Sequence, residues 1–204
     1  MPETRLANII SYIFHPLLIP TYTLILFFNM SIYYSYVIPE YSKIRIIGLV
    51  FITTFLFPLI INLIFLKYRL IPSLQMKMRE ERVLPFIVTA VFYYMTYHII
   101  KQLYLPDFYN LYLLGATLLV LIALIINFFC KISLHMLAIG GMTGIFLGLS
   151  LKLMLGIPYI IISIIFVSGL IGFARLKLKQ HKASEVYSGY FVGLTILLVL
   201  FLLF

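Results

Sequence analysis

The sequence predicts an all-α protein, a polytopic bundle of about seven transmembrane helices, with six as the alternative count. Two observations predict this fold class. Of the 204 residues, 64% are hydrophobic and 10% are charged, whereas a soluble domain has about 45–50% apolar and about 25% charged residues. The apolar residues also form runs of roughly 20, the length that a helix needs to cross the hydrocarbon core of a bilayer.

Short, mostly basic segments separate these runs. The first run is longer than the apolar region of a signal peptide and no small-residue cleavage site follows it, so we expect it to remain as a helix. Pro39, Pro106 and the Gly156–Pro158 segment mark breaks between runs, because proline ends helices and glycine favours turns. The predicted spans are 7–30, 44–66, 86–104, 110–130, 134–155, 158–174 and 185–204.

Glycine and proline have particular places within the runs. Glycine at every fourth position lets neighbouring helix backbones approach closely, and packing alone explains the spacing. Prolines inside membrane helices are tolerated as kinks. The glycines are Gly140, Gly144 and Gly148 in the fifth run and Gly189 and Gly193 in the seventh, and the prolines are Pro16, Pro20 and Pro58.

Composition limits the domain count and the partners. We expect one integral membrane domain, residues 1–204, because no linker-like segment or charged tail marks a second domain. The net charge of +9 suits anionic lipid headgroups or phosphate-bearing substrates. Nucleic acid is not an expected partner, since the chain has little polar surface. The single Cys130 excludes an intramolecular disulfide.

Basic residues gather on one predicted face of the membrane. With seven alternating spans, the N-terminus and the loops at 67–85, 131–133 and 175–184 share this face, which the positive-inside rule would make cytoplasmic. Five of the cations on this face are also candidates for substrate binding, and such cations do not set the topology. Without these five, six Lys and Arg residues remain on this face against four on the opposite face. The orientation of the chain in the membrane therefore stays open. We expect the protein in a bacterial inner (cell) membrane.

Ionisable residues near helix ends are functional candidates in a membrane protein, because charge at membrane depth is costly. The first cluster leads into the third span and combines Lys77, Arg79 and Arg82 with Glu80 and Glu81. It is either a solvated, self-paired segment or a group of cations that grips a phosphate, which guanidinium binds with two parallel hydrogen bonds.

The second cluster lies where the fifth span begins and consists of Lys131, Ser133 and His135. Ser133 is suited to cap the helix, and His135 could be a packing residue. A helix N-terminus with a hydroxyl, unpaired N–H groups and a lysine is equally suited to bind an anion. Both interpretations stay open at this point.

The third cluster, Arg175, His181 and Glu185, precedes and enters the seventh span. His181 and Glu185 are four residues apart, so on a helix they share a face and the carboxylate can hold one ring nitrogen. That contact would fix the tautomer, leave the other nitrogen nucleophilic and stabilise the imidazolium. The alternative is an ordinary basic loop.

Together the three clusters resemble the type 2 phosphatidic acid phosphatase superfamily of membrane lipid phosphatases. The family pattern is Lys-x6-Arg-Pro, then Pro-Ser-Gly-His, then Ser-Arg-x5-His-x3-Asp. The third motif corresponds to Ala174-Arg175-x5-His181-x3-Glu185, with a conservative change of acid. The second keeps only its serine and histidine, in Ile132-Ser133-Leu134-His135, and the first keeps an arginine, Arg79 or Arg82, without the following proline. The resemblance covers residues 77–204.

The resemblance implies a metal-independent and cofactor-free phosphatase that acts on a phosphorylated lipid through a phosphohistidine. His181 would attack phosphorus, Glu185 would orient it, and His135 would protonate the leaving alkoxide and later activate water. The phosphoryl oxygens would bind to the remaining candidates, Arg175, Ser133, Lys77, Arg79, Arg82 and Lys131.

Two other functions are compatible with the same residues. One is a catalytically degenerate relative that binds or translocates lipid, because Leu134 replaces the motif glycine and could block close approach of phosphate. The other is a zinc hydrolase with His135, His181 and Glu185 as ligands, which the lack of a His-Glu-x-x-His pattern disfavours. We expect structural roles for the two remaining histidines, His98 and His15, the latter filling a kink before Pro16.

Overall fold

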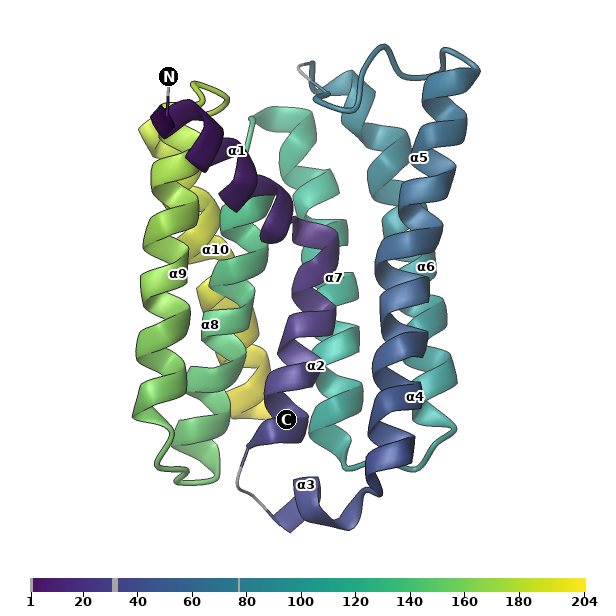
Figure 1. Ribbon diagram of the computed structural model, residues 1–204, viewed down its shortest axis with the longest axis vertical. Helices are drawn as coiled ribbons and strands as arrows, with labels where there is room; N and C mark the ends of the chain where they lie inside the picture. Colours follow the sequence, from purple (N-terminus) through teal and green to yellow (C-terminus); the bar gives the residue numbers. More distant parts are fainter. Residues whose placement is uncertain (1, 31–32, 77) are drawn as a thin grey trace. The chain divides into compact units, whose positions relative to one another are not determined.

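The computed structural model describes residues 2–30, 33–76 and 78–204. All regular elements within these ranges are helical, and seven helical segments are long and apolar enough to cross a membrane (Figure 1). The predicted fold class is therefore confirmed, and the chain is an integral membrane protein. The observed spans are Glu3–Asn29, Glu40–Lys67, Glu80–Lys101, Asp107–Phe129, Leu134–Lys152, Pro158–Lys177 and Ala183–Leu203.

The described residues form two compact units. Unit 1 combines the N-terminal segment, up to Ile19, with Cys130–Phe204, and unit 2 comprises Pro20–Phe129. The single membrane domain expected for residues 1–204 stays a prediction. Unit 1 contains the second and third clusters of the sequence, whereas the first cluster belongs to unit 2.

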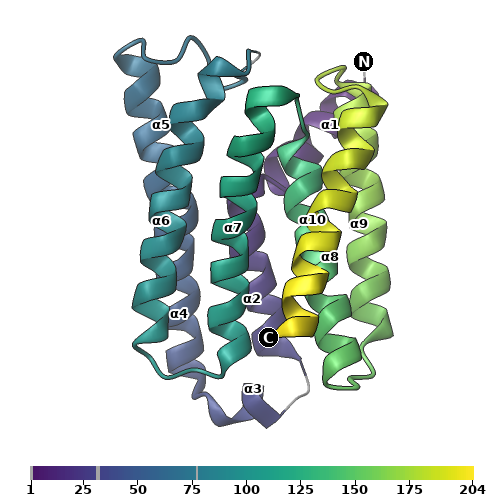
Figure 2. The ribbon, with the colours of Figure 1, turned by 180° about the vertical axis from the view of Figure 1, so that it is seen from behind.

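Unit 1 is built around a buried helix, α8. Glycines make up much of the face of α8 that contacts α10, and the two helices lie side by side (Figure 2). The helix α9 packs on α8, and the N-terminal α1 packs on α9. The helical elements of unit 1 are α1 (Pro2–Ile13), the 3-10 turn η1 (Pro16–Leu18), α8 (Leu134–Lys152), α9 (Pro158–Lys177) and α10 (Ala183–Leu203).

The glycine spacing serves the contact between α8 and α10, as predicted. A Cβ atom on Gly140 would overlap the backbone carbonyl of Tyr190, and one on Gly193 would overlap that of Leu137. A Cβ atom on Gly189 would lie 2.8 Å from the carbonyl oxygen of Ser133. The two backbones thus meet directly, and this contact holds the N-terminal ends of α8 and α10 together.

The first span is interrupted where Pro16 follows His15. Proline disfavours helical geometry in the residue before it, and His15 is extended, with φ −62° and ψ 136°. The helix α1 accordingly ends at Ile13, and the chain turns through η1, which has Pro16 at its first position. The kink expected at this proline is a complete break in the helix.

Unit 2 contains the second part of the first span, from Pro20, and the second, third and fourth spans. The second span of the chain contains a π-helical segment one turn before Pro58. Proline lacks the N–H that a regular helix would need at this position. The hydroxyl of Thr54 bonds to the carbonyl of Val50 at 2.8 Å within this stretch. The elements are α2 (Ile19–Asn29), α3 (Tyr33–Val37), α4 (Glu40–Phe51), η2 (Ile52–Leu56), α5 (Phe57–Lys67), η3 (Glu80–Arg82), α6 (Val83–Lys101) and α7 (Asp107–Phe129).

Candidate functional site

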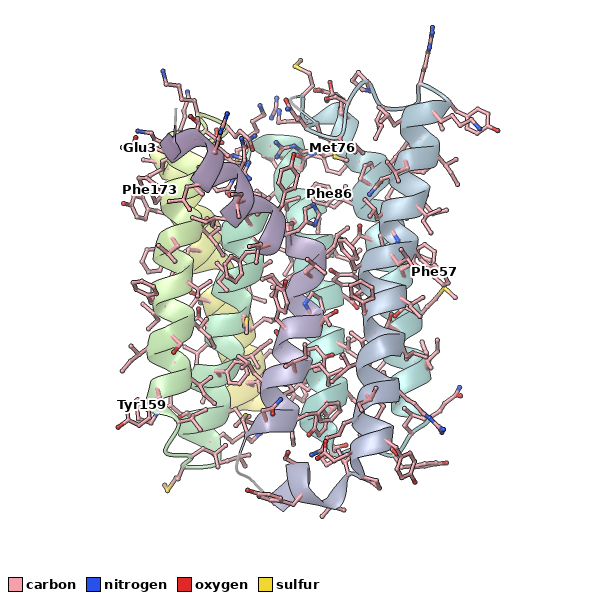
Figure 3. The ribbon with its side chains drawn as sticks, in the orientation of Figure 1. Glu3, Phe57, Met76, Phe86, Tyr159 and Phe173 are labelled. Carbon is pink, nitrogen blue, oxygen red and sulfur yellow. The ribbon has the colours of Figure 1, made fainter. Side chains whose placement is uncertain are left out.

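One end of unit 1 brings the second and third clusters together. Because α8, α9 and α10 alternate in direction, the first turns of α8 and α10 and the last turn of α9 lie at the same end. The N-terminal segment joins them there through an ion pair between Glu3 and Lys177. Figure 3 shows Glu3 beside the end of α9 that carries Phe173, with Tyr159 at the opposite end of that helix.

His181 and Glu185 form a close side-chain hydrogen bond at the start of α10. Nδ1 of His181 lies 2.6 Å from Oε2 of Glu185, and the two side chains are 7% and 16% exposed. Since a carboxylate only accepts hydrogen bonds, Nδ1 carries the proton. In the neutral ring Nε2 is then the nitrogen with the lone pair, the one that can attack phosphorus.

The helical setting expected for this pair is wrong in one respect. The helix α10 begins at Ala183 with Lys182 as its N-cap, so His181 lies before the helix and does not share a helix face with Glu185. Side chains in a helix lean toward its N-terminus, and Glu185 therefore reaches back over the N-cap to His181. The positive end of the helix dipole also favours a carboxylate in this first turn.

Arg175 lies in the last turn of α9, and its side chain is buried. The residue is 5% exposed, and α9 continues to Lys177, so Arg175 belongs to a helix and not to the loop in which the sequence placed it. Its guanidinium is close enough to the rings of His15 and His135 to interact with both electrostatically. A buried cation at this position provides positive charge for an anionic ligand.

Ser133 is the N-cap residue of α8, but its hydroxyl makes no capping bond. The residue is fully buried, and Oγ has no hydrogen-bond partner among the described residues. Its backbone N–H donates to the carbonyl of Glu185 at 3.2 Å, which joins the starts of α8 and α10. A buried hydroxyl without a partner costs about 1–3 kcal/mol, a cost that a ligand oxygen bonded to Oγ would remove.

His135, in the first turn of α8, contacts the N-terminal segment. Nε2 of His135 lies 3.2 Å from the carbonyl oxygen of Ser11. The ring packs edge-on against that of His15, with centroids 5.8 Å apart and an interplanar angle of 76°. His181 is also close enough to His135 for an electrostatic interaction. The structure thus places His135 near both the buried Arg175 and the other predicted catalytic histidine, His181.

The first cluster has a different setting, inside unit 2. Arg79 donates from Nη1 to the carbonyl oxygen of Phe129 at 2.7 Å, so it caps the last turn of α7. Arg82 donates from Nε to the carbonyl oxygen of Met76 at 3.0 Å and is buried. Lys77 lies outside the described residues. These hydrogen bonds of the two arginines go to backbone carbonyls of unit 2.

Two further predictions concern Lys131 and a metal. Lys131 is half-buried just before α8 in unit 1, as expected for the second cluster. Within the described ranges, no three His, Cys, Asp or Glu side chains are grouped closely enough to hold a metal ion. That search includes His135, His181 and Glu185, the ligands considered for zinc.

Sequence reasoning missed two residues of the N-terminal segment, Ser11 and His15. His15 was expected to fill a kink and bond a carbonyl that the kink frees, and this stays a prediction; its Nδ1 accepts a hydrogen bond from the N–H of Leu17 at 3.3 Å. The signal in the sequence was the His15-Pro16 pair within an apolar run. His98 contacts the ring of Tyr94 in α6, with centroids 4.6 Å apart.

Comparison with known proteins adds no family assignment. No family model, no curated protein and no solved structure matches this chain. The resemblance to type 2 phosphatidic acid phosphatases therefore depends on the motif residues alone and stays a prediction.

Proposed function

We propose that this chain is a membrane phosphatase that hydrolyses a lipid phosphate or a lipid pyrophosphate through a phosphohistidine on His181. The observation that carries the proposal is the arrangement of the His181–Glu185 pair against the N-terminus of α8. The hydrogen bond from the backbone N–H of Ser133 to the backbone carbonyl of Glu185 joins the pair to the start of α8. Arg175 and His135 lie at the same end of unit 1.

The phosphoryl group would be bound by donors that unit 1 already holds in place. Arg175 supplies a buried positive charge, and Ser133 supplies a hydroxyl without a described partner. The first turn of α8 adds backbone N–H groups that have no intrahelical acceptor, together with the positive end of the helix dipole. Donors held rigidly around the equatorial oxygens stabilise the charge of a phosphoryl-transfer transition state.

The reaction would proceed in two steps. In the first, Nε2 of His181 bonds to phosphorus while the bond from phosphorus to the lipid oxygen breaks, and His135 gives that oxygen a proton. In the second, water attacks phosphorus, the bond to Nε2 breaks, and His135 takes a proton from the water. Glu185 holds Nδ1 of His181 throughout and stabilises the positive ring. The products are a lipid alcohol, or a lipid monophosphate from a pyrophosphate, and inorganic phosphate.

The bilayer setting favours a lipid substrate. The site is at the end of helices that cross the membrane, so a phosphate headgroup can reach it while the acyl or prenyl part stays in the hydrocarbon. A bacterial inner membrane is the proposed location. Fractionation of cells that express the chain at native levels tests the location.

Leu134 is the observation that favours a second candidate, a lipid-binding or lipid-translocating protein without catalysis. It occupies the first helical position of α8, where the family motif has glycine, and its side chain is half-buried beside the proposed anion site. A side chain there restricts how closely phosphate can approach the backbone. This candidate predicts lipid phosphate binding that survives neutralisation of His181, without turnover.

The deciding experiment measures phosphate release by the purified full chain in detergent. The panel contains phosphatidic acid, phosphatidylglycerol phosphate, a polyprenyl pyrophosphate and a lipid A phosphate, each with and without a chelator. Variants are His181→Ala and, as a matched control, His98→Ala, which removes a histidine from α6. We expect chelator-resistant release that His181→Ala abolishes and His98→Ala retains.

Samples with 32P-labelled substrate that are quenched in alkaline denaturant would then contain a phosphoprotein whose label is stable in base, is released by acid, and is missing in His181→Ala. Release that persists in folded His181→Ala would exclude the phosphohistidine mechanism. No release from any lipid by folded wild type, combined with measurable binding, would favour the second candidate.

A further inference from the structure

The N-terminal segment contributes to the candidate site, although it lies outside the predicted phosphatase-like core of residues 77–204. The Glu3–Lys177 ion pair ties α1 to α9, and η1 packs against α8. The last turn of α1 carries Ser11, whose carbonyl contacts His135. No motif of the resemblance includes this segment, so its function requires a separate explanation.

The Ser11 carbonyl determines which nitrogen of His135 carries a proton. A backbone carbonyl can only accept a hydrogen bond, so at 3.2 Å Nε2 of His135 must donate. A neutral imidazole has one protonated and one unprotonated nitrogen. Nδ1 is therefore the basic nitrogen of neutral His135 and the atom through which this ring can exchange a proton with a ligand.

The break at Pro16 makes this contact possible. The last four carbonyls of a helix have no intrahelical donor, and Ser11 is among the last residues of α1, which ends at Ile13. If the helix continued, the N–H of His15 would be the donor to the Ser11 carbonyl. In the structure α1 ends at Ile13, before the extended His15 and Pro16, and the Ser11 carbonyl contacts Nε2 of His135.

His15 forms the second contact of the His135 ring. Its own orientation is determined by η1, because its Nδ1 accepts from the N–H of Leu17 as the N-cap of that turn. The edge-on packing of the two rings, with centroids 5.8 Å apart, then limits rotation of His135 about its side-chain bonds. A hydrogen bond at Nε2 and a neighbouring ring therefore both limit the orientations open to His135.

We propose that the segment from α1 to η1 is a positioning element of the site, in which the Ser11 carbonyl and the His15 ring hold His135 in its Nε2–H tautomer. Nδ1 then performs the proton transfers of the proposed phosphatase, on whose function this role rests. In the first step the proton on Nδ1 of the imidazolium goes to the leaving lipid oxygen. In the second, Nδ1 takes a proton from the attacking water, and Nε2 keeps its own proton throughout.

The tautomer can be measured without any enzymatic assay. The full chain is labelled with 15N in its four histidine rings, purified in detergent and studied by NMR in alkaline buffer, and His135→Gln assigns the His135 signals. We expect a protonated Nε2 and an unprotonated Nδ1. A protonated Nδ1 in wild type would overturn the proposal, whether or not the protein is a phosphatase.

Kinetics of three His15 variants separate positioning of His135 from simple capping of η1. Asparagine can cap the turn but has no ring, whereas phenylalanine keeps a ring edge and cannot cap. In metal sites, loss of the partner that orients a histidine ligand typically lowers activity about 10–100-fold, and we use the same range for the orientation of His135. We expect a decrease of this size in kcat for His15→Ala and His15→Asn, little change in KM, and a smaller decrease for His15→Phe.

His98→Ala serves as the matched control, and each outcome has a distinct meaning. Restoration of wild-type kcat by His15→Asn would show that capping is the whole role and would overturn the proposal. An unchanged kcat in His15→Ala would do the same. If wild type releases no phosphate from any lipid, the proposed function fails, and the NMR measurement alone decides whether His135 is held as described.

Discussion

Replacing Gly189 with alanine should disturb the site through the contact between α8 and α10. The added Cβ would lie 2.8 Å from the Ser133 carbonyl oxygen and 3.3 Å from Cβ of Met136, whereas ordinary contact begins at 3.4 Å. Relief requires a separation of about 0.6 Å, the difference between 2.8 and 3.4 Å. The neighbour is backbone at the N-cap of α8 and cannot rotate away.

Two unfavourable effects and one favourable effect contribute to the result. Overpacking costs typically about 1–3 kcal/mol. The Ser133–Glu185 backbone bond, already 3.2 Å long, would lengthen beyond hydrogen-bonding distance, which costs about 0.5–1.5 kcal/mol. Alanine gains at most about 1 kcal/mol over glycine in a helix interior. We expect a net loss of about 1–3 kcal/mol in the free energy of unfolding.

The assay is unfolding of the purified variants in mixed micelles by an increasing fraction of denaturing detergent. Gly169→Ala on α9 is the matched control, because a Cβ there has nothing within 4 Å, and it should be neutral or slightly stabilising. On the proposed mechanism, Gly189→Ala should also lower kcat, since a displacement of about 1 Å at a reacting group can cost about 100-fold. Equal stability of the two variants would refute the reasoning about close backbone contact.

Three more predictions concern single side chains. Glu185→Gln removes the negative charge beside the His181 ring and should lower kcat for phosphate release about 10²–10⁴-fold, the range of acid–base contributions. Partial recovery of kcat in Glu185→Asp would support this role of Glu185. An unchanged kcat in Glu185→Gln would contradict this role. Ser133→Ala removes a buried hydroxyl without a described partner, so the free energy of unfolding should stay equal or rise while KM increases; a marked loss of stability would show that the hydroxyl is bonded. Arg79→Ala removes the donor to the carbonyl of Phe129. Because this bond is exposed and water can partly replace it, the change should cost about 0.5–1.5 kcal/mol of stability, the net value of a typical hydrogen bond. No change in the unfolding midpoint would refute the capping role.

The spans were predictable because each depends on local composition. A run of about 20 apolar residues is stable across a bilayer only as a helix, since hydrocarbon offers no partners for backbone polar groups. Each of the seven predicted ranges overlaps an observed span. The ends were less accurate, as for α9, which continues through Arg175 to Lys177, because the terminal turns are polar and resemble loops in composition.

Part of the candidate site was also predictable from spacing. The four-residue separation of His181 and Glu185 indicated their contact, although the helix that was expected to hold them begins after His181. The pairing of these residues with His135 and Arg175 required the additional assumption that helices alternate across the membrane. The same assumption placed the loop at residues 67–85 on the same face of the membrane, but it did not predict which groups Arg79 and Arg82 contact.

Ser11 and His15 show what the sequence could not indicate. Their contacts with His135 join positions more than 100 residues apart, and Ser11 takes part through its backbone, which is the same for every residue type. Pro16 indicated a kink, but whether the freed carbonyls would meet water, lipid or a side chain depended on what packs beside α1.

By itself the sequence determined the membrane location and the seven helical spans, because hydrophobic length and local backbone chemistry act within each segment. It also determined the order of the chemical groups along the chain. Only the tertiary structure decided that the ends of α8, α9 and α10 meet, because that depends on glycines in two helices allowing contact between backbones. The orientation of His135 was likewise decided by tertiary structure, since a hydrogen bond to a distant carbonyl exists only after the helices have packed.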